Sequence, residues 1–387
     1  MCDILDAKNG SGASLNSKSY KAILETLKME ILSGKYSSCH AFPSVGTLVR
    51  KFGVARGTVH HAFDELARQG LISRKQGRGT FVTNNAVSRK IGLIVPGVAC
   101  TDFFQPIVSE INQLARKEDY TLLFAEVFSM DREERVHQVR ELAAEFVKKR
   151  VAGVIYEPLA EPGGAEPNEH ILRVFKRARI PVVLIDCDIV PFPQRSDYDV
   201  IGVNDVEAGA KIANHLLSVG ARKIHFLISK LCPTTFLNRL YGAEAELIRA
   251  GRFKKGSVLY AEPEDVAALK RHIRKNGKPD AFVCSNDPSA VVFKKTLEAA
   301  GLSIPKDVML TGFADMPMAS LTTPPLTTIR QDRNQLGGVA FRRLLQRIAE
   351  PDLPANEILF PAPLVVREST MRVKKGTGKR EQGTGKR

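Results

Sequence analysis

The side chains with the clearest chemistry stand at the start of a short helical pattern near Arg56. Four apolar residues recur there at helical spacing and would bury one side of the helix: Val59, Ala62, Phe63 and Leu66. The other side would turn polar or small residues outward: Arg56, Gly57, Thr58, His60 and His61. An arginine can donate paired hydrogen bonds to guanine or to a phosphate, and a threonine hydroxyl suits a phosphate oxygen. The pattern therefore predicts contact with nucleic acid.

The elements around this helix have the layout of a winged helix-turn-helix. A short helix over residues 44–52 stops at Gly53, and the second helix begins near Arg56. A strand-like LIS segment, a turn through Gly77 and Gly79, and a second strand, TFV, follow. An earlier helix over residues 20–33 has an apolar stripe: Tyr20, Ile23, Leu24, Leu27 and Ile31. Such a unit presents a helix N-terminus to the major groove, so double-stranded DNA is the expected partner.

The positive charge of the chain is concentrated at its two ends. The 387 residues carry a net charge of +15, but residues 1–90 hold fourteen Lys/Arg against six Asp/Glu, and residues 371–387 hold seven against one. A basic, small N-terminal domain is typical of nucleic-acid binding, and a basic surface serving only solubility is the alternative. The length suits two or three domains, and 43% apolar and 26% charged residues are ordinary for a globular protein.

Cysteine spacing and apolar runs argue against several classes of protein. The six cysteines are scattered and form no C-x-x-C pair, which favours a reducing compartment over disulfides or zinc. Adjacent His60 and His61 point about 100° apart on a helix and make poor joint metal ligands. No apolar run approaches the roughly 20 residues that span a bilayer, and the N-terminus lacks the features of a signal peptide. We therefore expect a cytoplasmic protein with no membrane contact, metal or cofactor.

Composition divides the chain into five parts. We expect a disordered segment at 1–19, the winged domain at 20–83, a linker at 84–89, a large α/β domain at 90–370 and a basic disordered tail at 371–387. Nine strand-length apolar runs define the large domain: IGLIV, TLLFAEV, GVIYEP, PVVLID, VIGV, KIHFLI, SVLYA, AFVCSN and VMLTGF. Helix-length amphipathic stretches separate them: 106–118, 133–150, 206–219, 235–250 and 290–300. The alternation predicts two parallel sheets flanked by helices, with a ligand crevice at the strand carboxyl ends.

Two known families resemble the two halves of the chain. Residues 20–83 resemble the GntR-type winged helix through FPS at 42–44, FGVARGTV at 52–59, GLI at 70–72 and GRGTFV at 77–82. Residues 90–369 resemble the LacI/GalR-type effector domain, a relative of periplasmic sugar-binding proteins, through IPVVLID at 180–186, ANHLLSVGARKI at 213–224, SNDPSA at 285–290 and GFAD at 312–315. The combination is similar to the arabinose-repressor subgroup of GntR-type regulators. The resemblance implies a two-lobed, periplasmic-binding-protein-like domain for effector binding and dimerisation.

The GntR resemblance also assigns DNA contacts to individual residues. On the recognition helix, the neighbouring helix and the wing they are Arg56, Gly57, Thr58, His60, Thr47, Arg50, Lys51, Gly77 and Arg78. His60 and Gly46 stand where the family commonly has further arginines. Ala55 replaces the usual hydroxyl-bearing N-cap, which removes roughly 1 kcal/mol of helix support. The operator sequence of the family therefore does not transfer.

The LacI/GalR resemblance assigns effector contacts in the same way. They are Arg239, Asn286, Asp186, Gln331, Asp315, Phe103 and Phe104. Planar polar side chains pair with the hydroxyls of a sugar, and Phe103 and Phe104 would form an apolar wall, although a place in the core explains them equally well. Asp186 could instead cap a turn, and Asp287 is expected as a helix N-cap. Ala314 replaces a frequent ligand carboxylate of the family, so the effector's identity does not transfer either.

These features together predict a homodimeric transcription regulator, a repressor, that binds a palindromic operator and a small carbohydrate-like effector. An activator or co-repressor-dependent regulator is the alternative within this class. An α/β enzyme would need a motif such as G-x-S-x-G, a P-loop or a G-x-G-x-x-G between strand and helix, and the sequence contains none of them, so no catalytic residue is assigned. A sugar receptor for transport would need an export signal and would have no use for a winged helix.

Overall fold

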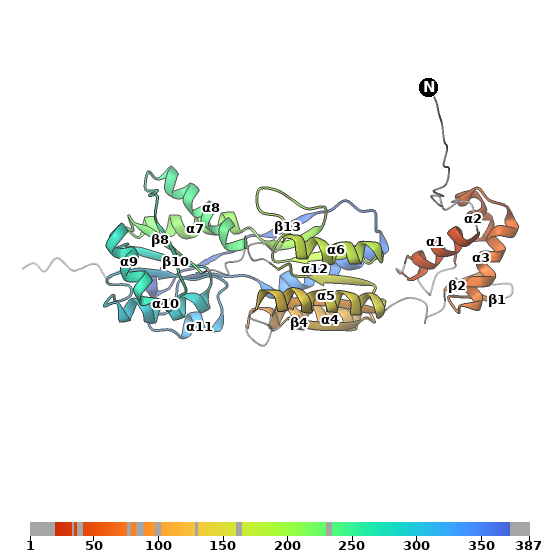
Figure 1. Cartoon of the computed structure of the whole chain (residues 1–387), viewed down its shortest axis with the longest axis horizontal. Helices are drawn as coiled ribbons and strands as arrows, with labels where there is room; N and C mark the ends of the chain where they lie inside the picture. The colour runs from red at the N-terminus through yellow and green to blue at the C-terminus, as the bar shows by residue number, and fades with distance from the viewer. Residues whose placement is uncertain are drawn as a thin grey trace, which may run out of the picture.

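The computed structural model describes residues 20–32, 35–36, 42–75, 79–82, 89–96, 102–127, 131–159, 165–229 and 234–371 (Figure 1). The N-terminal unit contains three helices and a hairpin: α1 (Tyr20–Leu32), α2 (Val45–Phe52), α3 (Arg56–Arg68), β1 (Ile72–Lys75) and β2 (Gly79–Val82). The two strands pair antiparallel, from Ile72 opposite Val82 to Lys75 opposite Gly79. This is the order of elements predicted for a winged helix-turn-helix.

An apolar core between α1 and α3 holds the N-terminal unit together. It includes Ile23, Leu27 and Ile31 from α1 and all four residues expected on the inner side of α3: Val59, Ala62, Phe63 and Leu66. Tyr20 departs from the expected stripe. It begins α1, is 43% exposed, and its ring lies 6.3 Å from that of His61. The helical period predicted the buried face correctly but not the end of the helix.

The first lobe of the large domain is built on a six-stranded parallel sheet with the order β13-β7-β6-β5-β3-β4. The strands are β3 (Lys90–Pro96), β4 (Thr121–Val127), β5 (Gly153–Tyr156), β6 (Val182–Ile185), β7 (Asp199–Val203) and β13 (Glu357–Phe360). Helices α4 (Phe104–Lys117) and α12 (Arg333–Ala349) pack on one face of this sheet, and α5 (Arg132–Lys148) and α6 (Ala165–Arg177) pack on the other. Burial on both faces explains the uninterrupted Val/Ile/Leu runs.

The second lobe has a four-stranded parallel sheet with the order β11-β10-β8-β9. Its strands are β8 (Ile224–Ile228), β9 (Val258–Tyr260), β10 (Ala281–Cys284) and β11 (Met309–Thr311). Helices α7 (Asp205–Ser218) and α8 (Thr234–Arg249) pack on one face. On the other face are α9 (Val266–Asn276), α10 (Asp287–Ala299) and the short α11 (Pro317–Leu321). The two lobes lie side by side in Figure 1.

The described chain passes between the lobes at three places. It leaves the first lobe after β7, returns after β12 (Thr328–Ile329), and leaves again between β13 and β14 (Leu364–Val365). Strands β12 and β14 pair antiparallel, and a 3-10 turn, η1 (Glu368–Thr370), ends the described chain. The predicted fold of two parallel sheets is confirmed. Within the described ranges, no helix is long and apolar enough to cross a membrane.

Candidate functional sites: an exposed helix and an interlobe pocket

The turn between α2 and α3 is fixed by local signals in the sequence. Ser44 caps α2 by accepting a 3.1 Å hydrogen bond from the backbone N–H of Thr47. Gly53 ends α2 in the left-handed conformation, with φ of 62°, and its N–H donates to the carbonyl of Val49 at 2.9 Å. A side chain is strained in that conformation, so glycine allows the sharp turn into α3.

The N-terminal end of α3 presents the predicted DNA-contacting residues to solvent. Arg56, Gly57 and His60 are exposed, and Thr58 is half-buried. Ala55 has the extended backbone of an N-cap but makes no side-chain capping hydrogen bond, as the sequence predicts. Free N–H groups at a helix N-terminus add to the attraction for phosphate. The wing residues Gly77 and Arg78 lie outside the described residues.

The three candidate contacts on α2 differ in whether their side chains are bound to another helix. Thr47 and Arg50 are exposed, although the Thr47 hydroxyl lies 2.9 Å from that of Ser44. Lys51 forms an ion pair with Glu30 of α1 at 2.7 Å. Lys51 therefore holds α2 against α1 in this structure.

In the second lobe, an unusually close helix pair positions Arg239. A Cβ on Gly209 of α7 would overlap the backbone carbonyl of Arg239, and a Cβ on Gly242 of α8 would overlap that of Val206. The two glycines therefore let the backbones of α7 and α8 come into contact, and this contact fixes the position of the Arg239 backbone.

Arg239 is held on three sides. Its Nε donates to Asp205 Oδ1 at 2.7 Å, its Nη1 donates to the Ser285 carbonyl at 2.7 Å, and its guanidinium carbon lies 3.3 Å from the centroid of the Phe313 ring. The residue is only 8% exposed. A guanidinium fixed by an ion pair and an aromatic face is pre-oriented for a planar or hydroxyl-bearing ligand.

Two carboxyl groups, those of Asp186 and Asp205, interact with this arginine, and a third, that of Glu157, interacts with Asp186; we call Glu157, Asp186 and Asp205 the acidic cluster. Glu157 follows β5 and Asp186 follows β6, where φ of 71° marks a left-handed turn. Burial raises the pKa of Asp205 to about 6, against the opposing effect of Arg239. Burial also raises the pKa of Asp186, again opposed by Arg239, and raises that of Glu157, with the Asp186 carboxylate adding to the effect. The Asp186 carboxylate therefore acts on both Glu157 and Asp205.

A cavity of about 390 Å³ lies beside the acidic cluster, between the two lobes. From the first lobe Asp186, Phe192 and Leu359 line it, and from the second lobe Asp205 and Asn238 line it. We call it the interlobe pocket. Of the predicted effector residues, only Asp186 is part of its wall. The wall does not include the others, which are Arg239, Asn286, Gln331, Asp315, Phe103 and Phe104.

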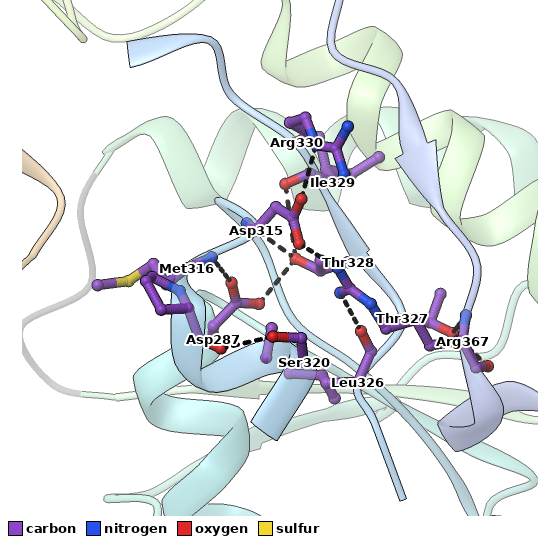
Figure 2. A network of polar contacts seen from close by, with 12 residues as sticks. Asp287, Asp315, Met316, Ser320, Leu326, Thr327, Thr328, Ile329, Arg330 and Arg367 are labelled. Atoms are coloured by element: carbon purple, nitrogen blue, oxygen red, sulfur yellow. Dashed lines mark hydrogen bonds and ion pairs between the residues drawn. The ribbon is translucent and has the colours of Figure 1, made fainter. Parts of the chain in front are cut away.

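Asn286 and Asp287 exchange the roles expected of them. Asn286 is the N-cap of α10, with its Oδ1 accepting from the Ser289 N–H at 2.8 Å, although Asp287 was expected in that position. Asp287 is fully buried and accepts hydrogen bonds from the Met316 N–H at 2.8 Å and the Thr328 hydroxyl at 2.7 Å (Figure 2). Burial raises the pKa of Asp287 to about 6. The extended backbone of Asn286 lets the earlier residue cap the helix and turns Asp287 into the lobe.

Asp315 is engaged by two arginines from the crossing segments. Arg330 Nε donates to its Oδ2 and Arg367 Nη2 to its Oδ1, both at 2.6 Å (Figure 2). Burial acts to raise the pKa of Asp315, but the hydrogen bonds from the two arginines outweigh it and lower the pKa. Asp315 thereby ties the loop after β11 to the segments that follow β12 and β14.

The remaining predicted effector residues occupy different environments. Gln331, on the crossing after β12, is 5% exposed, and its Nε2 has no hydrogen-bond partner among the described residues. Phe104 lies in the core of the first lobe, and half-buried Phe103 packs against the cores of both lobes. The rings of Phe103 and Phe104 meet edge to face, 4.9 Å apart. These two aromatics thus occupy core positions at the boundary of the lobes.

Glu157 and Asp205 were missed from the sequence. Glu157 ends the strand run GVIYEP just as Asp186 ends PVVLID, so the rule that selected Asp186 could have selected it. Asp205 opens a helix, where an acidic residue normally serves the helix end. Among the described residues, no three His, Cys, Asp or Glu side chains are grouped as metal ligands would be.

Comparisons with known families agree with the two-part architecture. Residues 19–82 match the family described as bacterial regulatory proteins, gntR family, and residues 213–370 match the periplasmic binding protein-like domain. The arabinose metabolism transcriptional repressor of Geobacillus stearothermophilus is 27% identical over 90% of this chain and 97% of its own length. The transcriptional repressor PurR of Mannheimia succiniciproducens is 27% identical over 74% of this chain and 82% of its own.

Solved structures show the same architecture in the large domain. The transcription regulator GntR from Chromobacterium violaceum aligns with a TM-score of 0.60 and 25% identity, over 73% of this chain and 99% of the other. A LacI family regulator from Enterococcus faecium with bound ribose aligns with a TM-score of 0.60 and 23% identity, over 74% and 100%. These relatives are regulators and not enzymes. The chain therefore carries a gntR-family helix-turn-helix domain and a periplasmic-binding-protein-like domain, and it is similar to transcriptional repressors.

Proposed function

We propose that this protein represses transcription by binding operator DNA through α3 and releasing it when a small carbohydrate-like effector occupies the space between the lobes. The observation that carries the effector half is the pre-oriented Arg239, fixed by Asp205, Ser285 and Phe313 beside a pocket lined by both lobes. A ligand that touches both lobes stabilises one interlobe arrangement over others. By linkage, effector and DNA then change each other's affinity by the same factor.

The proposed DNA contacts are Arg56, Gly57, Thr58 and His60 of α3, Thr47 and Arg50 of α2, and Gly77 and Arg78 of the wing. The exposed α3 terminus supports the first group. We propose that two copies in the cytoplasm bind a palindromic operator, because a two-fold protein presents two recognition helices to two half-sites. Affinity should fall steeply with salt because phosphate neutralisation supplies much of it.

The proposed effector contacts are Arg239, Asp186, Asn286 and Gln331, with Phe103 and Phe104 supporting the wall of the site from the core. Gln331 is supported by its buried amide nitrogen, which has no hydrogen-bond partner among the described residues, since burying such a donor without a partner costs about 1–3 kcal/mol. Asp315 is assigned a positioning role, because both of its oxygens already accept from arginines.

The test uses the full-length protein and two measurements. DNA sequences selected from a random pool are assayed by fluorescence anisotropy, and a panel of pentoses, hexoses, uronates and sugar phosphates is assayed by thermal shift. A ligand at 100 times its Kd should add about 2.7 kcal/mol of stability. A sugar that both stabilises the protein and weakens DNA binding supports the function. DNA binding with no sugar response contradicts the effector half, and absence of selected DNA contradicts the regulator itself.

A further inference from the structure

The acidic cluster contains more carboxyl groups than Arg239 can pair. Arg239 pairs with Asp205, but no ion pair or side-chain hydrogen bond among the described residues engages the carboxylates of Glu157 or Asp186. The lining of the interlobe pocket also holds more acidic than basic side chains. Asp186 and Asp205 line it, and the one arginine in its wall, Arg195, is already paired with Glu357 at 3.0 Å.

Glu157 supplies an observation that is independent of the pocket. The residue is only 9% exposed, and its Oε2 has no hydrogen-bond partner in the described part of the chain. Burying an ionised carboxylate without a partner is costly, and folded proteins rarely leave such an oxygen unsatisfied. The amide nitrogen of Gln331 is a second buried polar atom without a partner, on a segment that joins the lobes.

Glu157 and Asp186 also lie where a ligand would meet them. Each directly follows its strand, β5 or β6, and these strands are parallel neighbours paired from Val154–Val182 to Tyr156–Leu184. Both residues therefore lie at the carboxyl edge of the first sheet on neighbouring strands, and Asp186 lines the interlobe pocket whereas Glu157 lies outside its lining. Ligands of open parallel sheets bind at this carboxyl edge.

From this geometry we infer that Glu157 and Asp186 form a subsite for a cationic nitrogen, so that the effector is an amine-bearing polar molecule such as an amino sugar. The inference rests on the proposed function and specifies its ligand class. A protonated amine supplies donors and a positive charge to two neighbouring carboxylates. A phosphate or carboxylate on the ligand would instead face uncompensated negative charge.

Matched ligands test the inference directly. Glucose and galactose are each compared with the 2-amino-2-deoxy sugar, the uronate and the 6-phosphate by calorimetry on the full-length protein. We expect at least one amino sugar to bind ten times more tightly than its neutral parent, and neither anionic form to bind more tightly than the parent. A neutral parent that binds as well as its amino form overturns the subsite, as does an absence of amino-sugar binding.

Substitutions of Glu157 and Asp186 test whether the acidic cluster causes the preference for an amino sugar. Glu157→Gln keeps the shape and removes the charge, and should reduce the amino-to-neutral affinity ratio at least fivefold. Asp186→Asn, whose amide tolerates a left-handed turn, is a second variant with the same expectation. Glu169→Gln, on the exposed surface of α6, is the control that should leave the ratio unchanged. An unchanged ratio in both cluster variants overturns the assignment.

Measuring operator binding distinguishes a failure of the cationic subsite from a failure of the proposed effector function. If a neutral sugar releases operator DNA and no amino sugar does, the repressor function stands and the cationic subsite is wrong. If no compound of the wider panel changes DNA affinity, the effector half of the function fails as well.

Discussion

The two candidate sites differ in how their side chains are prepared for a partner. On α3, Arg56 and His60 are exposed to solvent, and neither forms a hydrogen bond or ion pair with another of the described residues. Between the lobes, Arg239 is 8% exposed and already bound to an aspartate, a carbonyl and an aromatic ring. DNA brings its own dense charge and can order exposed side chains, whereas a small ligand must find its partners already in place. Removing the Arg56 or His60 side chain should therefore affect binding alone, whereas removing that of Arg239 should affect binding together with stability.

The largest effect is expected from Arg56→Ala. Losing a paired contact costs about 1–3 kcal/mol at each half-site, so a dimer on a palindrome should lose roughly a hundredfold or more in operator affinity. Arg68→Ala, at the other end of the same helix and paired only with Glu65, is the control and should bind normally. Fluorescence anisotropy with the selected operator measures both. Equal affinities for the two variants would remove Arg56 from the recognition surface.

Arg239→Ala should be severe in a different way. It leaves the Asp205 carboxylate buried without its partner, and breaking a buried ion pair costs about 3–5 kcal/mol. The double variant Arg239→Ala/Asp205→Ala should recover much of that stability while sugar binding stays lost. Chemical denaturation and calorimetry separate the two effects. Recovery of ligand binding in the double variant would show that Arg239 is structural.

One kind of substitution should have opposite signs in the two regions. Gly209→Ala forces a methyl group into the backbone of α8 and should destabilise the second lobe by about 1–3 kcal/mol or more. At Gly57 on α3 a Cβ meets no atom within 4 Å, so Gly57→Ala should stabilise by about 0.5–1 kcal/mol. Thermal unfolding of both variants provides the comparison. Equal shifts would mean that α7 and α8 can separate without cost.

The sequence predicted elements better than it predicted contacts. Strong apolar runs located nine strands of the large domain, because parallel strands buried on both faces leave an unmistakable pattern. Strand β13 was not predicted, because it is an edge strand whose residues alternate between exposed and half-buried. It also joins the first sheet only after the whole second lobe has intervened in the sequence. The two-residue β12 is too short for any periodic pattern.

The candidate sites show the same limit. The exposed face of α3 follows from helical period alone, and Ser44 and Gly53 mark the two ends of the neighbouring helix α2. By contrast, Asp315 meets Arg367 from 52 positions away, and Asp205 meets Arg239 from 34 positions away. Nothing local in the sequence distinguishes a carboxylate that awaits a ligand from one already engaged by an arginine.

The smallest predicted effect concerns the two helix starts of the winged unit. Ser44 and Ala55 have nearly the same backbone, with φ and ψ of −65° and 155° against −63° and 149°, yet only Ser44 caps its helix. Ala55→Ser should therefore gain about 1 kcal/mol by capping α3 as Ser44 caps α2, and Ser44→Ala should lose a similar amount. Urea unfolding of the two variants measures the pair. A loss without a matching gain would mean that the 3.0 Å bond from the Thr58 N–H to the Ala55 carbonyl already secures the start of α3. The exposed recognition helix would then be as firmly prepared by its backbone as Arg239 is by its side-chain partners.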